Sequence, residues 1–454
     1  MQLKRPARDL RRWLVAASCG LLSASVARAQ DGGDASPPAD DGPATVVDTA
    51  LAYYHESDGR VRAIEPIVSV HRDYGDERAA NVKLTFDSLS GATPNGAVPS
   101  RKAQTFATPS GKSLNATPQT YTTASGNVVV VSAPIYIVGP GQLPMDPNYH
   151  DQRLAVNGSY DLPWDRLTRS TFGADLSYEH DFLSASLNAS LARDLNDKNT
   201  TISAGVNGEF DLVQPIGGSP VPLSDYTLFE KVGNHSKHDL NLVLGATQVM
   251  NRHWLTDLSL SADRFSGYLN DPYKIVSLVD PGGNVTGYLY ENRPGTRTRG
   301  SVFLENRVAT DRTSVSLSLR YMTDSWAIHS QTAQLKLRWW NPDHDRYLEP
   351  TARWYRQTAA SFFSPWISST TTTPLSYASA DQRLGAFHAI RGGLKYSAKW
   401  ADDTGPDGSE LSVRAEWYRQ TSDNTFVLPG ALQGLNVFPG LSAVLMSFEW
   451  RFNW

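Results

Sequence analysis

Ionisable side chains alternate with apolar ones along many segments of this 454-residue chain, and their signs are unevenly distributed. In the first half the polar positions carry mainly carboxylates: Glu65, Asp87, Asp175, Glu179, Glu209, Asp239, Asp257 and Asp263. In the second half they carry mainly cations: Arg307, Arg320, Lys336, Arg338, Arg353, Arg391, Lys395, Lys399, Arg414 and Arg451. If both sets line one water-filled space, an acidic wall faces a basic one, and the transverse field orients dipolar solutes. The alternative is that opposite charges bridge a narrow or collapsed interior.

The sequence contains no motif that identifies a catalytic or metal-binding site. It has no Gly-x-Ser-x-Gly elbow, no His-Glu-x-x-His and no phosphate-binding loop. His235 and His238 could ligate a metal, but two solvated loop histidines explain them more simply, and turn chemistry explains Asp343, His344 and Asp345. Ten histidines and many serines leave a triad at a barrel rim open, but no spacing selects one. We therefore expect no enzyme, no cofactor and no metal site.

One short motif occurs twice, at residues 354–358 and again at 417–421, in both cases reading Trp-Tyr-Arg-Gln-Thr. Each copy ends an expected strand just before a long connection. Two Arg, Gln and Tyr clusters could bind an anionic ligand through charge-assisted hydrogen bonds. We favour the other interpretation, an aromatic girdle whose arginine reaches lipid headgroups.

The elements that position these side chains are strands, because apolar and polar residues alternate with a period of two over about ten residues at a time. Val315, Leu317 and Leu319, for example, alternate with serines. The pattern predicts about sixteen strands, with fourteen as the alternative. Their expected ranges are 50–57, 61–73, 79–89, 152–161, 170–181, 182–193, 200–213, 237–250, 254–267, 299–309, 313–323, 326–340, 346–357, 383–399, 409–420 and 443–454.

The strands of a β-sandwich would show the same alternation of apolar and polar residues. The strands expected here, however, are longer than the average of about five or six residues in soluble proteins. Aromatic residues such as Trp164, Trp254 and Trp339 also gather near strand ends, where a headgroup layer would meet them. Strands can span a bilayer only when closed into a barrel, because every backbone group must be paired. The sequence thus predicts an all-β fold, a transmembrane up-and-down antiparallel β-barrel.

The connections between these strands support the same fold. All long connections, at about 90–151, 214–236, 268–298, 358–382 and 421–442, occupy alternate slots, as the external loops of a bacterial barrel do. The last strand carries Phe448, Trp450, Phe452 and Trp454 at alternate positions, the terminal aromatic pattern that the barrel-assembly machinery reads. An ordinary aromatic edge strand is the less favoured explanation.

The N-terminus has the three parts of a secretory signal peptide at residues 1–29. Lys4 and four arginines precede an apolar stretch, and Ala27-Arg28-Ala29 is a cleavage site. A twin-arginine signal at Arg11-Arg12 and lipidation at Cys19 are less favoured. Residues 30–49 have the composition of a flexible periplasmic tail, and the barrel is expected over 50–454.

Composition excludes several classes of protein. No run of about 18 apolar residues predicts a transmembrane helix, and 12 Trp, 19 Tyr and 15 Phe are too many for a disordered chain. A formal net charge of −4 without a basic block argues against nucleic acid. The expected location is the outer membrane of a Gram-negative bacterium, with lipid and the assembly machinery as partners.

Four groups of residues carry a family resemblance: Leu51–Tyr54 with Ile64–Pro66, Asp87–Ala97, Tyr321–Ser330, and Tyr347–Pro350 with Trp354–Thr358. In these the chain resembles the uncharacterised bacterial outer-membrane barrels grouped as domain of unknown function 3570, over essentially all of its mature length. The resemblance implies a barrel and an exported location. It implies no reaction and transfers no functional residue.

Two functions remain as hypotheses: a channel for small polar solutes, and a non-conducting scaffold that docks a periplasmic or surface partner. The longest loop, 90–151, holds the apolar runs Val128–Val131 and Ile135–Val138 on either side of Pro134. Such runs avoid water, so we expect the loop to fold inward across the pore mouth or to pack as a short hairpin on the rim. In the first case Lys102, Asp146 and His150 are the candidate constriction residues. A disordered insert is the alternative.

Overall fold

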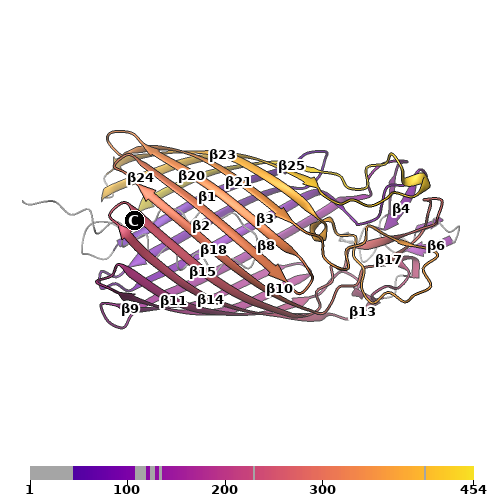
Figure 1. The fold of residues 1–454 in the computed structure, drawn as a ribbon, viewed down its shortest axis with the longest axis horizontal. Helices are drawn as coiled ribbons and strands as arrows, with labels where there is room; N and C mark the ends of the chain where they lie inside the picture. Colours follow the sequence, from indigo (N-terminus) through magenta and orange to yellow (C-terminus); the bar gives the residue numbers. More distant parts are fainter. Residues whose placement is uncertain (1–43, 108–118, 123–127, 132–134, 229–230, 403–404) are drawn as a thin grey trace, which may run out of the picture.

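The computed structural model describes residues 44–107, 119–122, 128–131, 135–228, 231–402 and 405–454. The expected signal peptide and most of the expected tail lie outside these ranges. Within them the chain forms one large cylinder of tilted strands, with a cluster of loops and short strands at one end (Figure 1). The C-terminus lies at the opposite end.

Sixteen strands of the described chain form a closed antiparallel barrel in which each strand pairs with the next, and β25 pairs with β1 to close it. The strands are β1 (Ala44–Glu56), β2 (Arg62–Asp73), β3 (Ala79–Pro94), β8 (Met145–Pro163), β9 (Thr168–Glu179), β10 (Phe182–Leu195), β11 (Thr200–Val213), β14 (His235–Asn251), β15 (Trp254–Gly267), β18 (Thr296–Ala309), β19 (Thr313–Asp324), β20 (His329–Trp340), β21 (Arg346–Gln357), β23 (Phe387–Asp402), β24 (Gly405–Ser422) and β25 (Leu441–Asn453). The predicted all-β barrel is confirmed, with sixteen strands and not fourteen.

The two faces of the barrel wall differ as the period of two predicts. Large apolar side chains such as Leu242, Leu317 and Phe448 are about half exposed on the outer face, while the polar residues between them face the lumen. An apolar outer surface suits lipid, and the ladder leaves no strand edge unpaired. No helix among the described residues is long and apolar enough to cross a membrane.

Several strand boundaries differ from the sequence prediction, among them the starts of β1, β20 and β23. β1 begins at Ala44, so residues 44–49 pair with β2 and β25 and do not belong to the tail. β20 begins at His329, because Ala327 takes a left-handed conformation (φ 66°) and Trp326 is buried outside the barrel. β23 begins at Phe387 because residues 382–384 form a 3₁₀ turn capped by the Asp381 side chain.

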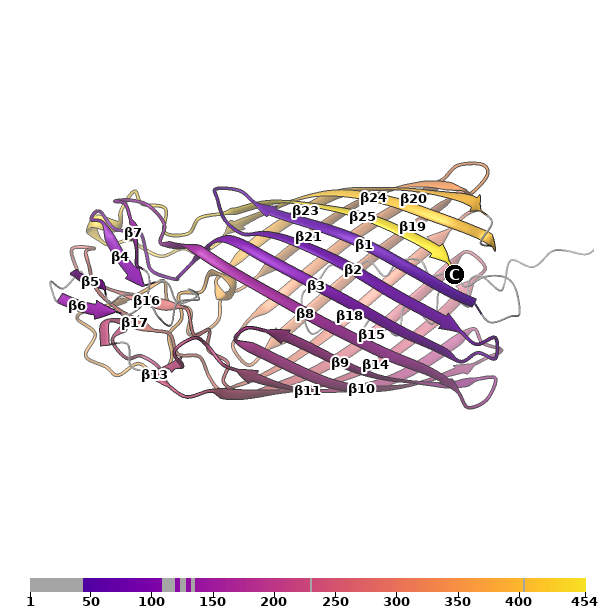
Figure 2. The ribbon, with the colours of Figure 1, turned by 180° about the vertical axis from the view of Figure 1, so that it is seen from behind.

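All five long connections leave the barrel at the same end and pack together there as a cap (Figure 2). The cap contains four small sheets: β4 (Gln104–Ala107) with β7 (Ile135–Val138), β5 (Gln119–Thr122) with β6 (Val128–Val131), β12 (Ser219–Pro220) with β13 (Lys231–Val232), and β17 (Val285–Tyr290) with β16 (Ile275–Val279) and β22 (Trp366–Ser368). It also contains the 3₁₀ turns Tyr226–Leu228, Gln382–Leu384 and Gly430–Leu432.

The longest loop is shorter than the sequence predicts and spans 95–144, because β3 extends to Pro94 and β8 starts at Met145. Its strands pair as β4 with β7 and β5 with β6, and they extend away from the barrel end (Figure 2). At its base, Phe106 is fully buried against Tyr136 of the same loop and against Tyr226 and Tyr288, which belong to two other loops. The loop is thus a hairpin held by the other loops, and it projects outward; neither an inward fold nor packing on the rim describes its outer part.

Candidate functional site

A cavity of about 2070 Å³ runs from inside the barrel to the underside of the cap. Its lining residues on β3 extend from Asn81, near the end of the barrel where the C-terminus lies, to Pro94 at the cap end. Acidic residues of β9, β11 and β14 line one side, and near the mouth arginines such as Arg293, Arg297 and Arg299 line it as well. The arrangement is a deep polar vestibule within a closed wall.

Most lumen carboxylates of the first half have an ion-pair or hydrogen-bond partner on the wall. Arg153 Nε donates to Asp87 Oδ2 at 2.5 Å, and Arg299 Nε to Asp263 Oδ2 at 2.9 Å. Asp175 accepts hydrogen bonds from Asn157 at 2.6 Å and Ser186 at 2.8 Å. Other predicted acidic residues are engaged as well: Asp257 accepts from Thr247 and Ser259, and Glu65 has a partner.

Most lumen cations of the second half are also paired along the wall. Arg338 meets Glu349 at 2.7 Å, Lys395 meets Glu449 at 2.9 Å and Arg451 meets Asp48 at 2.6 Å. The remaining pairs are Arg307 with Glu305, Lys399 with Glu410, and both Arg391 and Arg414 with Glu416, while Lys336 has a partner too. These pairs join residues on the same strand or on strands next to or one removed from each other, so none of them spans the lumen.

Three further predicted lumen residues, Asp239, Arg320 and Arg353, make no ion pair among the described residues. Both carboxylate oxygens of Asp239 are buried without a hydrogen-bond partner. Arg320 Nη2 donates only to the Ser301 hydroxyl, at 3.2 Å. Arg353 makes no hydrogen bond or ion pair within the described chain, and with Arg320 it lines a second cavity of about 200 Å³ inside the barrel.

Several charged residues of the lumen were missed in the sequence analysis. Arg153, Lys237 and Arg299 lie among the acidic strands, and Lys237 pairs with Asp211 at 3.1 Å. These three cations and Asp211 all occupy lumen-facing positions of the same alternation. Listing every charged residue on that face of each strand would therefore have found them. The two walls therefore differ in charge less than the sequence analysis predicts.

A carboxylate trio at the mouth was not predicted. One oxygen each from Asp151, Glu179 and Asp181 lies within 4.8 Å of the other two. They come from β8, the end of β9 and the turn to β10, and the hydroxyl of Tyr273 in the cap donates a hydrogen bond to Asp181. Exposed or half-buried acidic groups often gather without a metal, and nothing else at this position indicates a ligand.

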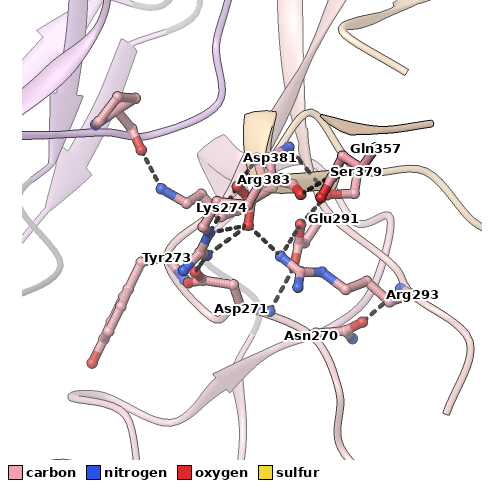
Figure 3. A network of polar contacts seen from close by, with 11 residues as sticks. Asn270, Asp271, Tyr273, Lys274, Glu291, Arg293, Gln357, Ser379, Asp381 and Arg383 are labelled. Atoms are coloured by element: carbon pink, nitrogen blue, oxygen red, sulfur yellow. Dashed lines mark hydrogen bonds and ion pairs between the residues drawn. The ribbon is translucent and has the colours of Figure 1, made fainter. Parts of the chain in front are cut away.

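The cap is fastened above this vestibule by a network of ion pairs (Figure 3), in which Glu291, Arg293 and Asp381 are buried and Arg383 reaches solvent. Arg293 bridges Glu291, at 2.7 Å, and Asp381, at 2.9 Å. Arg383 bridges Asp381, at 2.6 Å, and Asp271, at 2.8 Å. The network joins the loop 268–295 to the loop 358–386.

Neutral groups complete this network. Ser379 Oγ donates to Glu291 Oε2 at 2.5 Å, and the amide of Gln357, at the end of β21, donates to the Arg383 carbonyl at 2.9 Å. Lys274 Nζ donates to the carbonyl of Pro94, at the end of β3. The network therefore ties the cap loops to each other and to the rim of the barrel.

Burial and charge act in opposite directions on the acids of this network. Burial favours the neutral form of Asp381, but the guanidinium groups of Arg383 and Arg293 outweigh it and hold the pKa of Asp381 well below its usual range. The pKa of Asp271 is lowered in the same way, against burial, by Lys274, Arg383 and Arg293. Burial raises the pKa of Glu291, which Arg293 offsets only in part.

The other candidate residues do not converge. His235 and His238 both lie in β14, not in a loop, and they point to opposite faces, where His235 stacks on Tyr268 and His238 contacts Phe210. They therefore cannot share a metal without a rearrangement of the strand.

The repeated motif is divided between the two faces of the wall. Trp354 and Trp417 are exposed on the outer face, as Arg356 and Arg419 are. The tyrosines face inward, and Tyr355 donates to Gln357 at 2.6 Å as Tyr418 does to Gln420 at 2.8 Å. This placement agrees with an aromatic girdle and separates the arginines from the inward Tyr and Gln groups.

The expected constriction residues are also separated. Asp146 and His150 line the vestibule. Lys102 is exposed in the cap and is not part of that lining.

Comparison with known structures finds other large barrels at very low identity. The chain matches Pseudomonas aeruginosa OccK2 (OpdF) at 7% identity and a TM-score of 0.38, covering 90% of this chain and 98% of the other. It matches a bacterial polysaccharide outer membrane secretin at 8% and 0.44, covering 90% and 98%. For Pseudomonas aeruginosa OpdK, solved with vanillate, the values are 8% and 0.37, with 91% and 99% covered.

None of these similarities is close enough to transfer a residue or an activity. No curated protein shows significant sequence similarity to the chain. A family model matches nearly the whole length, from residue 11 to residue 452. The chain therefore belongs to the family described as proteins of unknown function DUF3570.

Proposed function

We propose that the protein is an outer-membrane channel for small polar solutes. The observation that carries this proposal is the cavity of about 2070 Å³, which runs inside a closed wall from near the terminal end of β3 to the cap. A barrel of sixteen strands is wide enough for an aqueous passage unless something fills it. Here the lining is polar and charged, as a water-filled lumen requires.

The charge arrangement favours polar solutes over apolar ones. Because most lumen charges are paired with a neighbour on the wall, the lining attracts dipolar molecules without holding one strongly charged species tightly. Near the mouth, Glu179 and Glu209 lie on one side and Arg293 and Arg297 are also part of the lining. A field between these groups would orient a solute as it enters.

The outer-membrane location follows from the same architecture. The outer face is apolar, the long loops leave one end, and both ends of the described barrel meet at the other, as β1 pairs with β25. Trp454 is 86% exposed beyond β25, where the barrel-assembly machinery could bind the terminal aromatic strand. We propose lipid and that machinery as partners, export by the signal peptide at 1–29, and no enzymatic activity.

Single-channel recording in planar bilayers tests the proposal. We expect steady conductance from purified, heat-modifiable protein, and conductance that rises when residues 103–145 of the hairpin are deleted, because the base of the cap narrows access to the vestibule. Silence from correctly folded wild-type and deleted protein would overturn the channel.

That silence would support the alternative, a scaffold that docks a partner. The observation in its favour is that the cap is well packed and yet presents apolar side chains to solvent. Val128 and Ile137 of the hairpin are 69% and 71% exposed, and Val427 is 92% exposed. Exposed apolar surface of this kind is common at contact sites.

A further inference from the structure

Two arginines of the basic wall, Arg320 and Arg353, differ from the other arginines predicted for that wall in making no ion pair within the described chain. Arg320 is solvent-exposed between the outward-facing Leu319 and Tyr321, so its exposure is to the lumen. Its single hydrogen bond runs to the neutral hydroxyl of Ser301, at 3.2 Å. Arg353 is half-buried and has no hydrogen bond or ion pair within the described residues.

The register places these two arginines around one point of the wall. Arg320 in β19 is paired with Thr332 of β20, and Arg353 in β21 is paired with Gln334 of the same strand. Thr332 and Gln334 point to the same face, two residues apart, so both guanidinium groups flank β20. The second cavity, of about 200 Å³, lies there and is lined only by residues of barrel strands.

The lining of this cavity offers donors and little opposing charge. Besides the two arginines it contains the hydroxyls of Ser301, Ser318 and Thr332 and the amide of Gln334. Its acidic member, Asp263, is already bonded to Arg299 Nε at 2.9 Å and to the Asn241 amide. An arriving anion would therefore meet two guanidinium groups without an adjacent uncompensated carboxylate.

The strand next to Arg353, β23, adds a further positive charge to this part of the wall. Arg353 lies directly opposite Arg391 across the β21–β23 pair. Glu416, the partner of Arg391, is also shared with Arg414 at 3.5 Å. Glu416 is thus occupied, and the cavity itself is lined by Arg299, Arg320 and Arg353 against Asp263, so a positive excess remains beside it.

We propose that Arg320 and Arg353 form a binding station for an oxyanion in the lumen, so that the channel favours small solutes bearing a carboxylate or phosphate group. The proposal rests on the channel function and names its solute class. Guanidinium groups present N–H donors in a planar fork that matches the oxygens of both groups. A volume of about 200 Å³ limits the bound part to a few non-hydrogen atoms, so the rest of a larger solute would extend into the lumen.

Binding to detergent-solubilised, folded protein tests the station independently of conduction. The probes are inorganic phosphate and gluconate, titrated calorimetrically into wild type and into the double variant Arg320→Gln with Arg353→Gln. We expect binding to weaken about 10-fold or more in the double variant, because hydrogen bonds to charged groups contribute about 1.5–3 kcal/mol each. A stronger effect on one probe identifies the phosphate or the carboxylate as the preferred group.

The matched control is Lys399→Gln, which removes a lumen cation that has Glu410 at 3.7 Å and lies nearer the terminal end of the barrel. Binding should stay at the wild-type value in this variant. If the double variant fails to show heat-modifiable folding, Arg320→Lys with Arg353→Lys keeps the charge and removes the fork, and an intermediate affinity is expected. Equal affinity of the wild type and the variants changed at both Arg320 and Arg353, or no binding to the wild type, would overturn the station.

Bilayer recording separates this result from the channel itself. With a KCl gradient, the wild type should prefer anions more than the Gln double variant does, as a shift in reversal potential. A pore that conducts with unchanged selectivity in that variant contradicts the station and leaves the channel intact. Phosphate binding by a protein that is silent in bilayers contradicts the channel and leaves the station intact.

Discussion

The barrel wall and the cap use charged pairs differently. In the wall, a buried carboxylate pairs with a cation that reaches the cavity, as Asp211 does with Lys237 at 3.1 Å. In the cap, Glu291 and Asp381 are equally buried, but they share Arg293 in one network that also contains Lys274 and Arg383. The wall pairs thus line a passage between strands that the backbone ladder already joins, whereas the cap network fixes the position of separate loops.

The energetic consequences also differ. In the wall, removal of a carboxylate such as Asp211 leaves a cation that reaches the cavity, where water solvates it. In the cap, removal of Asp381 leaves the buried guanidinium group of Arg293 short of a partner, and breaking a buried pair costs about 3–5 kcal/mol. Substitutions that remove one charge should therefore affect the cap strongly and the wall weakly, and three predictions use this contrast.

The largest effect is expected for Asp381→Asn in the cap. The change removes the shared partner of Arg293 and Arg383, and the cap should open locally about 100- to 1000-fold more often. Hydrogen exchange of residues 268–295 and 358–386 measures this, while the barrel strands keep their protection. Wild-type exchange in these loops would show that the network does not hold the cap.

The control for this variant is Asp76→Asn at the other end of the molecule. Asp76 also pairs with an arginine, Arg78, at 2.6 Å, but both side chains are about half exposed in the turn between β2 and β3. We expect no measurable change in exchange there or in the cap. The two variants remove the same charge and differ mainly in burial.

A smaller, graded effect is expected from pH. Asp381 and Asp271 have lowered pKa values, so their stabilisation is present above the ordinary value of about 4 and is lost as the pH falls below it. The raised pKa of Glu291 has the opposite sign, because its protonation relieves burial as the pH falls. Cap protection should thus stay level or rise slightly from about pH 7 to about pH 5, and decrease below about pH 4.

Hydrogen exchange corrected for its intrinsic pH dependence checks this profile. A steady loss of cap protection as the pH falls from about 7 to about 5 would contradict it, because it would require a stabilising group that ordinarily titrates in this range and has a lowered pKa in the folded cap.

The contrast between wall and cap also explains what the sequence could predict. Strands such as β19 follow from local alternation, since Val315, Leu317 and Leu319 face outward whatever their partners are. The predicted start of β20 was wrong because Trp326 resembles the aromatic residues that occur at strand ends. In the structure it is instead buried in a cap cluster with Phe362, which lies in another loop. No local pattern contains that contact.

The candidate site shows the same limit. The lumen face of each charged residue follows from the period of two, including Arg320 and Arg353. Which charges remain without a partner depends on register across strands, for example on Asp263 lying opposite Arg299. The network of the cap joins Arg293 and Asp381, 88 residues apart, and only the folded loops bring them together.

The smallest effect is expected for Asp239→Asn in the wall, the same chemical change as Asp381→Asn. Asp239 is only 6% exposed, yet neither carboxylate oxygen has a hydrogen-bond partner among the described residues. Its negative charge is thus poorly compensated, and the neutral amide should leave stability unchanged or raise it by up to about 1 kcal/mol. Thermal unfolding of purified protein, followed by the loss of heat-modifiable migration, compares the two. A destabilisation as large as that of the cap variant would show that the wall also depends on buried charge, because Asp239 would then have to be compensated by a group that the lumen supplies.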